Sequence, residues 1–261
     1  MAGWALAFFL GCCALAASDQ PVRSYSNGFS IVLKTSEGLF QSLPASSAQN
    51  IAPRPVSIQP LDLPSIEPVA ITDEGKVTRE VSLSMGLIDL MNHVAHAKAI
   101  DHKQPGFFAS YLTNFARAGC DASCAADIVD ERYWTEDILN DQQSYFNQMA
   151  SILIAINLSH HYLGHSDKYA EKTMGPDTKT HPINDFLSPA EWQASVKAGT
   201  INSLDYGMAT EGARALFEAI DQMPKRPAWV AYLAPATVDL KDLNKSFARY
   251  EDDFFHGRIK R

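Results

Sequence analysis

Cysteines and basic residues are scarce in this chain, and each shortage excludes a class of partner or site. Only four cysteines occur in 261 residues, and two of them, Cys12 and Cys13, lie in an apolar segment at the N-terminus. The 22 lysines and arginines are outnumbered by 30 aspartates and glutamates, which gives a net charge of −8. Duplex nucleic acid is therefore not an expected partner, because its phosphates would be repelled.

A long apolar run is also missing. The apolar segment at residues 4–17 is too short to span a bilayer comfortably, and it ends in the small residues ALAAS. This profile is typical of a secretory signal, although no Lys or Arg precedes it. We therefore expect residues 1–17 to be removed, leaving an exported protein, periplasmic or secreted, without a transmembrane segment. The alternatives are a wrongly assigned start codon, a retained anchor, or a lipoprotein cleavage box at Leu10-Gly11-Cys12.

Two common catalytic motifs are absent. The sequence has neither a glycine-rich phosphate loop nor a GxSxG nucleophile elbow. The remaining cysteines, Cys120 and Cys124, lie four residues apart and can close a small disulfide loop in an oxidising compartment. Metal binding is the competing role, but it lacks a second pair of cysteines, so we favour the disulfide.

The composition and periodicity predict a mainly α protein. With 46% hydrophobic residues, the chain can bury a core as one large domain or two small ones. Strand patterns occur at residues 27–34 and 76–82, separated by an extended linker or arm at 44–68 that holds six of the 14 prolines. We assign 18–82 to this N-terminal β and proline-rich segment and 83–261 to a helical domain.

Within the helical domain, the spacing of apolar residues changes from two to three and four. The pattern predicts helices over residues 84–100, 107–118, 131–141, 149–165, 188–199, 204–223 and 239–255. Residues 229–233 are expected to form a short strand or a buried connection. A polar loop of about twenty residues, 166–187, is expected between the helices, and a loop of that length is usually functional or mobile.

Residues 149–165, MASILIAINLSHHYLGH, carry no charged side chain, which predicts a central helix that is buried all round. Asn157, His161 and His165 fall on one helical line, whereas His160 points about 100° away. The histidines are either metal or catalytic ligands, or a polar cap whose imidazoles meet main-chain carbonyls. Asn157 either orients His161 or pairs with a neighbouring helix, since a buried amide needs hydrogen bonds.

This stretch resembles the active-site helix of zinc metallopeptidases of the Ste-endopeptidase and heat-shock HtpX kind, in which HELAH is followed by two residues and LGH. The agreeing residues are Leu158, His160, Leu163, Gly164 and His165. Ile156 and Asn157 stand where the family has its first ligand histidine and its catalytic glutamate. In a register shifted by five residues, His161 and His165 have the HExxH spacing, but Tyr162 replaces the glutamate. The resemblance implies a zinc hydrolase scaffold without its general base.

A second pattern is similar to the helical zinc-dependent phospholipase C and single-strand nuclease group, whose signature begins HYxGD. His161, Tyr162 and Gly164 match it, and His165 stands at the aspartate ligand. Downstream, Glu171 stands at a ligand histidine, and His181 with Asp185 repeats an HxxxD spacing. The N-terminal tryptophan ligand of that group is not evident.

Two imidazoles alone rarely hold a catalytic zinc ion, so a carboxylate must complete the site. Glu171 follows His165 by six residues, and Glu211 resembles the downstream helix glutamate of the metallopeptidase pattern. Glu211 lies off the apolar stripe of its helix, and a solvated glutamate is its alternative role. The predicted zinc ligands are His161, His165 and Glu171 or Glu211, with His160, Asn157, His181 and Asp185 as supporting or alternative ligands.

A second histidine set lies on the helix predicted at residues 84–100. Asp89, His93 and His96 share a face at i, i+4 and i+7. They are either metal ligands or a base with its orienting carboxylate, or a partly exposed polar stripe opposite the apolar side of the helix.

The function predicted from these residues is a metal-dependent, metallopeptidase-like hydrolase that acts on a small molecule or a peptide. A zinc-dependent phosphoesterase is an alternative within the same class. The rival from a different class is a non-catalytic exported helical protein with a binding or structural role, which the replacements at Ile156 and Asn157 favour. The oligomeric state is not predicted.

Overall fold

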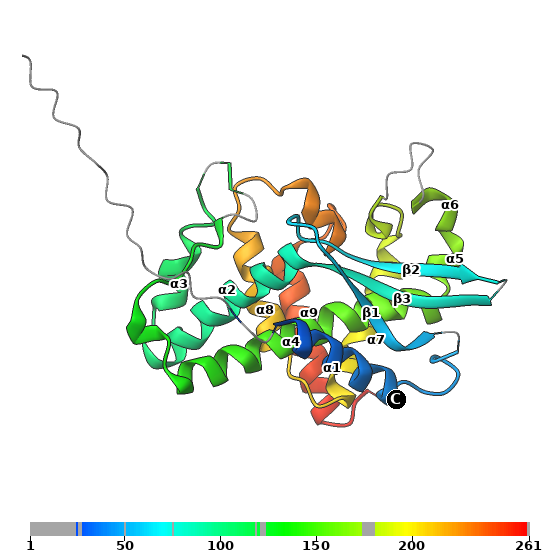
Figure 1. Ribbon diagram of the computed structural model, residues 1–261, viewed down its shortest axis with the longest axis horizontal. Helices are drawn as coiled ribbons and strands as arrows, with labels where there is room; N and C mark the ends of the chain where they lie inside the picture. Colours follow the sequence, from blue (N-terminus) through cyan, green and yellow to red (C-terminus); the bar gives the residue numbers. More distant parts are fainter. Residues whose placement is uncertain are drawn as a thin grey trace, which may run out of the picture.

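The computed structural model describes residues 25, 28–49, 51–74, 76–117, 119–120, 124–173 and 181–259 (Figure 1). The described part of the chain is mainly helical with one three-stranded sheet, which confirms the mainly α character that the sequence predicts. The predicted signal peptide, residues 1–17, lies outside the described residues. Within the described part of the chain, no helix combines the length and the apolar character that crossing a bilayer requires.

The sheet has the order β1-β3-β2 and is formed by β1 (Ile51–Gln59), β2 (Ile66–Asp73) and β3 (Lys76–Ser84). The middle strand, β3, pairs in parallel with β1 and antiparallel with β2. It confirms the strand predicted at residues 76–82. The linker predicted at 44–68 is wrong, because this segment contains β1 and the start of β2. Its prolines are tolerated since both strands are edges, where a missing N–H need not interrupt the ladder.

Residues 28–42 form a helix, α1 (Gly28–Ser42), where a strand was predicted at residues 27–34. The β-branched Ile31 and Val32 suggested the strand, but tertiary packing decides otherwise. The buried residues of α1 are Gly28, Val32, Thr35, Ser36 and Leu39, which is helical spacing. This face packs against β1 and α4, so the local preference for a strand is overridden.

The other elements follow the predicted order with shifted bounds, except that the two helices predicted at 131–141 and 149–165 are one helix and that the helix predicted at 107–118 ends at Leu112. They are α2 (Met85–Lys103), α3 (Phe107–Leu112), α4 (Glu136–Tyr162), α5 (His165–Lys168), α6 (Ala170–Thr173), α7 (Pro189–Asp205), α8 (Glu211–Asp221) and α9 (Leu240–Phe255). Short 3-10 turns occur at Glu131–Tyr133, Ile183–Asp185 and Ala228–Tyr232. The loop predicted at 166–187 is wrong in its first part, which forms α5 and α6; residues 174–180 lie outside the described residues.

Local sequence signals set two of these helix starts. Ser188 and Glu191 form a capping box before α7, in which the side chain of each accepts from the main-chain N–H of the other. Asp239 caps α9 by accepting from two main-chain N–H groups. The ends were less well predicted: α7 continues six residues beyond Gly199, to Asp205, and α8 begins only at Glu211.

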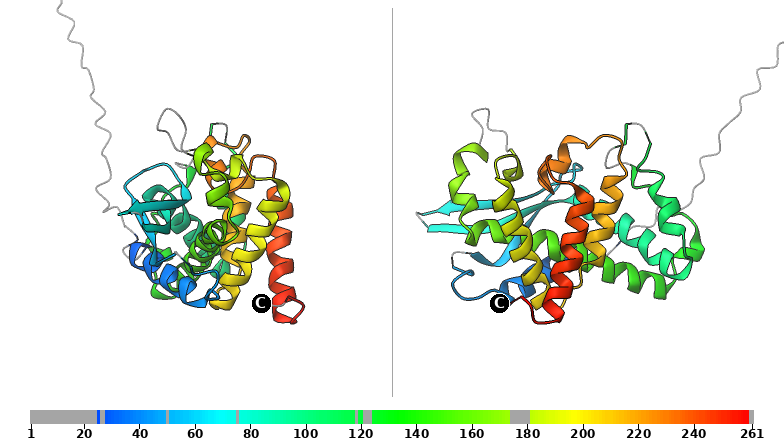
Figure 2. Two further views of the ribbon diagram at one scale, coloured as in Figure 1. Left: turned by 90° about the vertical axis from the view of Figure 1, so that its right-hand side faces the viewer. Right: turned by 180° about the vertical axis from the view of Figure 1, so that it is seen from behind.

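Helix α4 contacts the sheet as well as α1, α2, α7 and α8. In the left view of Figure 2, the sheet and the α7–α9 pair lie on opposite sides of the molecule. Every side chain of α4 from Met149 to His161 is buried. Gly199 of α7 lies so close to α4 that a Cβ there would be 2.5 Å from the main-chain nitrogen of Ile156. The absence of a side chain at Gly199 therefore sets the distance between the two helices.

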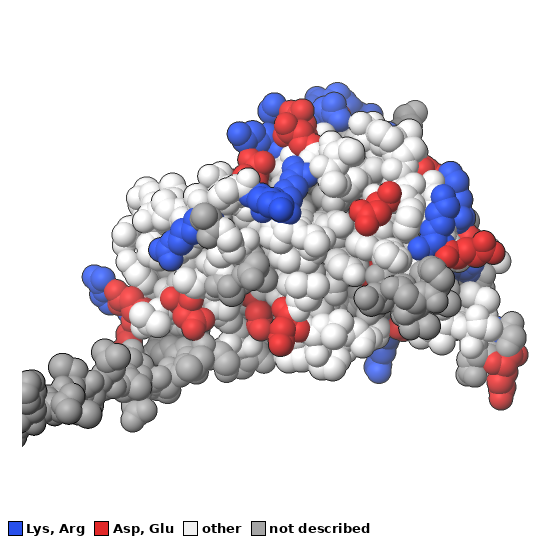
Figure 3. Space-filling model, turned by 90° about the horizontal axis from the view of Figure 1, so that it is seen from above, with Lys and Arg blue, Asp and Glu red and all other residues white. Residues whose placement is uncertain are grey.

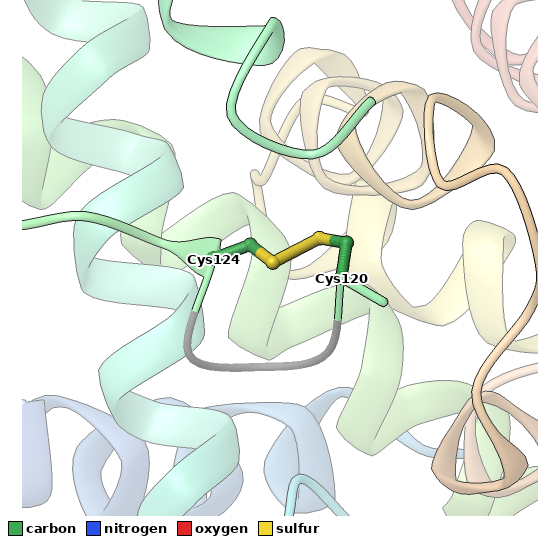
Figure 4. The surroundings of a disulfide bond; sticks show 2 residues. All are labelled: Cys120 and Cys124. Carbon is green, nitrogen blue, oxygen red and sulfur yellow. A yellow bond between two sulfur atoms is a disulfide. The ribbon is translucent and has the colours of Figure 1, made fainter. Parts of the chain in front are cut away.

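Cys120 and Cys124 form a disulfide, which confirms the role preferred from the sequence (Figure 4). Their Cα atoms are 5.6 Å apart, a usual distance for a disulfide. The bond lies between α3 and the segment that leads into α4.

Candidate functional site

The histidines of the central stretch do not share one helical line, and that prediction is wrong. Helix α4 ends at Tyr162, and Gly164 adopts a left-handed conformation with φ of 78° before α5 begins at His165. Glycine adopts this conformation at little cost and commonly ends a helix. The turn moves His165 off the line defined by Asn157 and His161.

His161 is bonded to the main chain of the sheet. Its Nε2 donates to the main-chain oxygen of Glu80 on β3 at 2.8 Å, so Nε2 carries the proton and Nδ1 the lone pair. Nδ1 is buried and has no hydrogen-bond partner among the described residues. Burial, with Arg79 nearby, lowers the pKa of His161 to about 4. His161 is therefore neutral at pH 7, and its Nε2–H is hydrogen-bonded to a main-chain carbonyl.

His160 and His165 form a buried cluster with Ser195, a residue that the sequence did not single out. The two Nδ1 atoms are 3.2 Å apart, and Ser195 Oγ on α7 is 3.1 Å from each. Burial and the neighbouring histidines lower the pKa of His160 to about 3, and burial lowers the pKa of His165. Both rings are thus neutral at pH 7, and one N–H and one O–H suffice to link the three atoms.

The predicted carboxylate ligands lie elsewhere. Glu211 pairs with Lys98 at 3.3 Å, and the next residue, Gly212, donates its N–H to Gln148 on α4. Gln148 precedes His160 by twelve residues, about 18 Å along a helix. Glu171 is exposed on α6. No three His, Cys, Asp or Glu side chains in the described part of the chain are arranged to hold a metal ion.

Asn157, at the position of the metallopeptidase glutamate, is turned back onto its own helix. Its Nδ2 donates to the main-chain oxygen of Leu153 at 2.9 Å, and the side chain is buried. The hydrogen bond to His161 that was considered from the sequence is not formed. The main chain of Ile156, at the position of the first ligand histidine, lies against Gly199 of α7. Neither residue is placed to bind or activate water.

The second histidine set links surrounding segments to α2. His96 donates from Nε2 to the main-chain oxygen of Tyr133 at 2.7 Å and accepts from the Tyr25 hydroxyl at 3.0 Å. His93 bonds to the main chain of Asp89 and to the carboxylate of Asp127. Burial lowers the pKa of His96. Both rings therefore have partners that give them a structural role, although His96 is fully buried and not partly exposed as the stripe interpretation assumed.

The outer edge of β2 carries main-chain groups that face away from the sheet. The main-chain N–H of Ser84 donates to the main-chain oxygen of Ser65, so residues 65 and 84 form a hydrogen-bonded pair. The next pair along the ladder, Ile66–Leu83, is therefore one whose main chains are not hydrogen-bonded to each other. Bonded and non-bonded pairs alternate along an antiparallel ladder. The main-chain N–H and C=O groups of residues 68, 70 and 72 on β2 therefore also point away from β3, except that Pro68 has no N–H. The position of Pro68 agrees with this, because proline has no N–H to donate to β3.

A pocket of about 190 Å³ lies between β2 and the segment formed by α5, α6 and the Ile183–Asp185 turn. Its polar lining residues are Glu67, Ser166, Thr173 and His181. His181 therefore belongs to this pocket and not to the histidine cluster, and Asp185 is exposed outside the lining. Residues 67–70 of β2 form one wall, so the pocket opens beside the outward main-chain groups of that strand.

A larger pocket of about 380 Å³ lies between α7 and α9. Its two acidic lining residues are already engaged: Asp239 caps α9, and Asp242 pairs with Lys245 at 2.8 Å. On the face drawn in Figure 3, Lys and Arg are dispersed among Asp and Glu and do not form one basic patch. Neither feature defines a ligand as closely as the pocket beside β2.

Comparison with known proteins gave no match: no family model, no curated protein and no solved structure is similar to this chain.

Proposed function

We propose that this protein is a non-catalytic binding protein that takes up an extended peptide along the outer edge of β2. The observation that carries the proposal is the row of outward main-chain groups on β2 beside a pocket. An extended peptide adds to such an edge as a further strand, with affinity from main-chain hydrogen bonds and specificity from side-chain pockets.

The state of the histidines supports a role without catalysis. Hydrolysis by a zinc enzyme of the resembled kind needs open imidazoles, a carboxylate ligand and a general base. Here His161 is bonded to Glu80, and Asn157 is bonded to Leu153. In this proposal, the polar residues of α4 stabilise the fold through hydrogen bonds and take no part in catalysis.

Export is part of the proposal. The Cys120–Cys124 disulfide suits an oxidising compartment such as the periplasm or the exterior. The apolar segment at residues 4–17, with small residues at its end, agrees with a secretory signal.

The edge is tested by substituting the outward positions of β2. Ala70→Pro removes one outward N–H without removing a hydrogen bond to β3, because the Ala70–Arg79 pair is of the non-bonded kind. We expect it to weaken binding of an extended peptide about tenfold, with a melting temperature close to that of the wild type. Ala70→Ser keeps the N–H and is the matched control.

Binding and cleavage are measured together by titrating a labelled library of extended peptides and recovering the peptides for mass spectrometry. Bound and intact peptides support the proposal. Peptides cut in the presence of added zinc, with loss of cutting in the His161→Ala, His165→Ala double variant, would instead establish the metal-dependent hydrolase. Self-association that disappears in Ala70→Pro would show that a second copy of the chain takes the edge.

A further inference from the structure

The pocket beside β2 contains an acidic side chain without a cationic partner. Glu67 is partly buried and forms no ion pair with any described residue. Burial alone raises the pKa of Glu67 to about 7. A carboxyl group in such a place is stabilised either by keeping its proton or by gaining a cation. A cationic ligand would therefore supply the interaction that the protein does not.

A second polar group in the same pocket also lacks a partner. Ser166 Oγ is buried and forms no hydrogen bond with a described residue. An unpaired buried hydroxyl costs free energy, which a ligand that bonds to it would recover. Glu67 and Ser166 lie on opposite walls, one on β2 and the other on α5. The pocket lining thus supplies one carboxylate and one hydroxyl as possible acceptors for a donor group of a ligand.

Among the described residues, three cations on the elements around this pocket contact other residues, and one of them, Lys172 on α6, lies over the rings of Tyr169 and Phe186. Arg79 bonds both oxygens of Asp167 at 3.0 Å, and Lys168 pairs with Glu191 at 2.6 Å. The exposed His181 is the other titratable group of the lining. The remaining wall is mainly apolar, with Pro68, Val69 and Ile183, and suits the methylene chain of a long side chain.

We propose that this pocket binds the primary ammonium group of a lysine side chain carried by the peptide on β2, with Glu67 and Ser166 as its acceptors. The inference rests on the proposed function, because the peptide main chain on β2 brings the side chain to the pocket. An ammonium group has three N–H donors and a compact shape, so it can bond to more than one acceptor of a small pocket lining.

The first test compares ligands on the unmodified full-length protein. The probes are one extended peptide with a single lysine, the same peptide with that lysine acetylated, and the same peptide with norleucine in its place. Acetylation removes the charge and norleucine removes the ammonium group, so we expect each to weaken binding about tenfold. Equal binding of all three peptides would overturn the inference and leave the proposed function intact.

The second test changes the protein. Glu67→Gln keeps the shape of the side chain and removes the charge, so we expect it to abolish the preference for lysine over norleucine. Ser166→Ala should reduce that preference in part. Glu171→Gln is the matched control, because Glu171 is an exposed carboxylate on the adjoining α6 and does not line the pocket. A lysine preference that persists in Glu67→Gln would overturn the inference.

A third probe separates the pocket from the strand edge. Nα-acetyl-lysine-methylamide carries the side chain without a peptide long enough to pair with β2. Shifts of the Val69 and Ser166 amide signals on its addition, absent in Glu67→Gln, would support the ammonium pocket even if no peptide binds along β2. A failure of this probe together with equal binding of the three peptides would show that the pocket does not recognise ammonium.

Discussion

The imidazole of His161 on α4 is hydrogen-bonded to the main-chain oxygen of Glu80 on β3 at 2.8 Å. This bond joins the buried part of α4 to the middle strand of the sheet. It also fixes the tautomer, because a carbonyl oxygen can only accept. The residue with the strongest sequence-based case as a metal ligand therefore has a structural partner already.

Removing this contact should destabilise the fold. His161→Ala removes one donor from the Glu80 oxygen, which keeps its ladder bond to Val69, and creates a cavity between helix and sheet, so we expect a loss of roughly 2 to 4 kcal/mol of unfolding free energy. Urea unfolding measures it. His256→Ala, at an exposed histidine of the same type, should change stability by less than about 0.5 kcal/mol. Equal effects of the two substitutions would contradict the assigned role.

The free energy of unfolding should fall with acid before the carboxylates are fully protonated. The pKa of His160 is about 3 and that of His161 about 4 in the folded protein, against 6.5 for an ordinary histidine. The unfolded chain thus binds protons that the folded chain refuses, so stability is full above pH 6.5 and falls as the pH drops toward 4. The pKa of Glu67 is raised from 4.5 to about 7, so the folded chain holds a proton there that the unfolded chain loses. The contribution of Glu67 to the free energy of unfolding therefore falls as the pH rises from 4.5 to 7.

The acid effect can be assigned to one residue. His161→Gln keeps an N–H donor but does not titrate, so its unfolding free energy should fall less steeply between pH 6.5 and 4 than that of the wild type. Denaturant melts at several pH values measure both slopes. Parallel slopes in the two proteins would show that His161 is not protonated on unfolding in this range.

Zinc should be unnecessary for folding. We expect protein purified without chelators to hold well under one equivalent of zinc by elemental analysis, and EDTA to leave its melting temperature unchanged, because a bound metal would stabilise the folded state by mass action. Stoichiometric zinc that disappears when both His161 and His165 are replaced by Ala would restore the predicted metal site.

The approach of α7 to α4 gives a sharper packing test. Alanine favours a helix interior over glycine by about 1 kcal/mol, yet Gly199→Ala would put a Cβ 2.5 Å from the Ile156 main-chain nitrogen and 2.8 Å from the Ala155 carbonyl carbon. We expect net destabilisation of roughly 1 to 3 kcal/mol from overpacking. Ala194→Gly, at an exposed position of the same helix, measures the difference in helix propensity between alanine and glycine without a change in packing. A stabilised Gly199→Ala would show that the helices separate freely.

Local signals predicted the helical part of this fold well. The apolar spacing located the starts of α2 and α9, and Ser188 marked the start of α7, each within one residue. Such signals lie within a few residues of one another, so a single sequence reveals them. The helix α1 was mistaken for a strand because its burial depends on β1 and α4, which are distant in sequence.

The candidate site was predicted less well for a related reason. The metal hypothesis assumed one continuous helix through His165, but the left-handed Gly164 redirects the chain. Ser195 was missed because its closeness to His160 depends on how α7 lies against α4, which no local pattern reports. Glu67 and Ser166 are ordinary residues in the sequence and become notable only when β2 and α5 lie side by side.

Pro68 has a further consequence for any chain that aligns with β2. The proline offers a carbonyl but no N–H, so one residue of the incoming chain finds no donor opposite its own carbonyl. Replacing the ligand amide whose carbonyl faces Pro68 by an ester weakens an acceptor that has no donor there, so it should change binding less than the same replacement opposite Ala70. A backbone-modified ligand series would thereby reveal the alignment of the two chains, and the same gap discourages endless stacking of copies into fibrils.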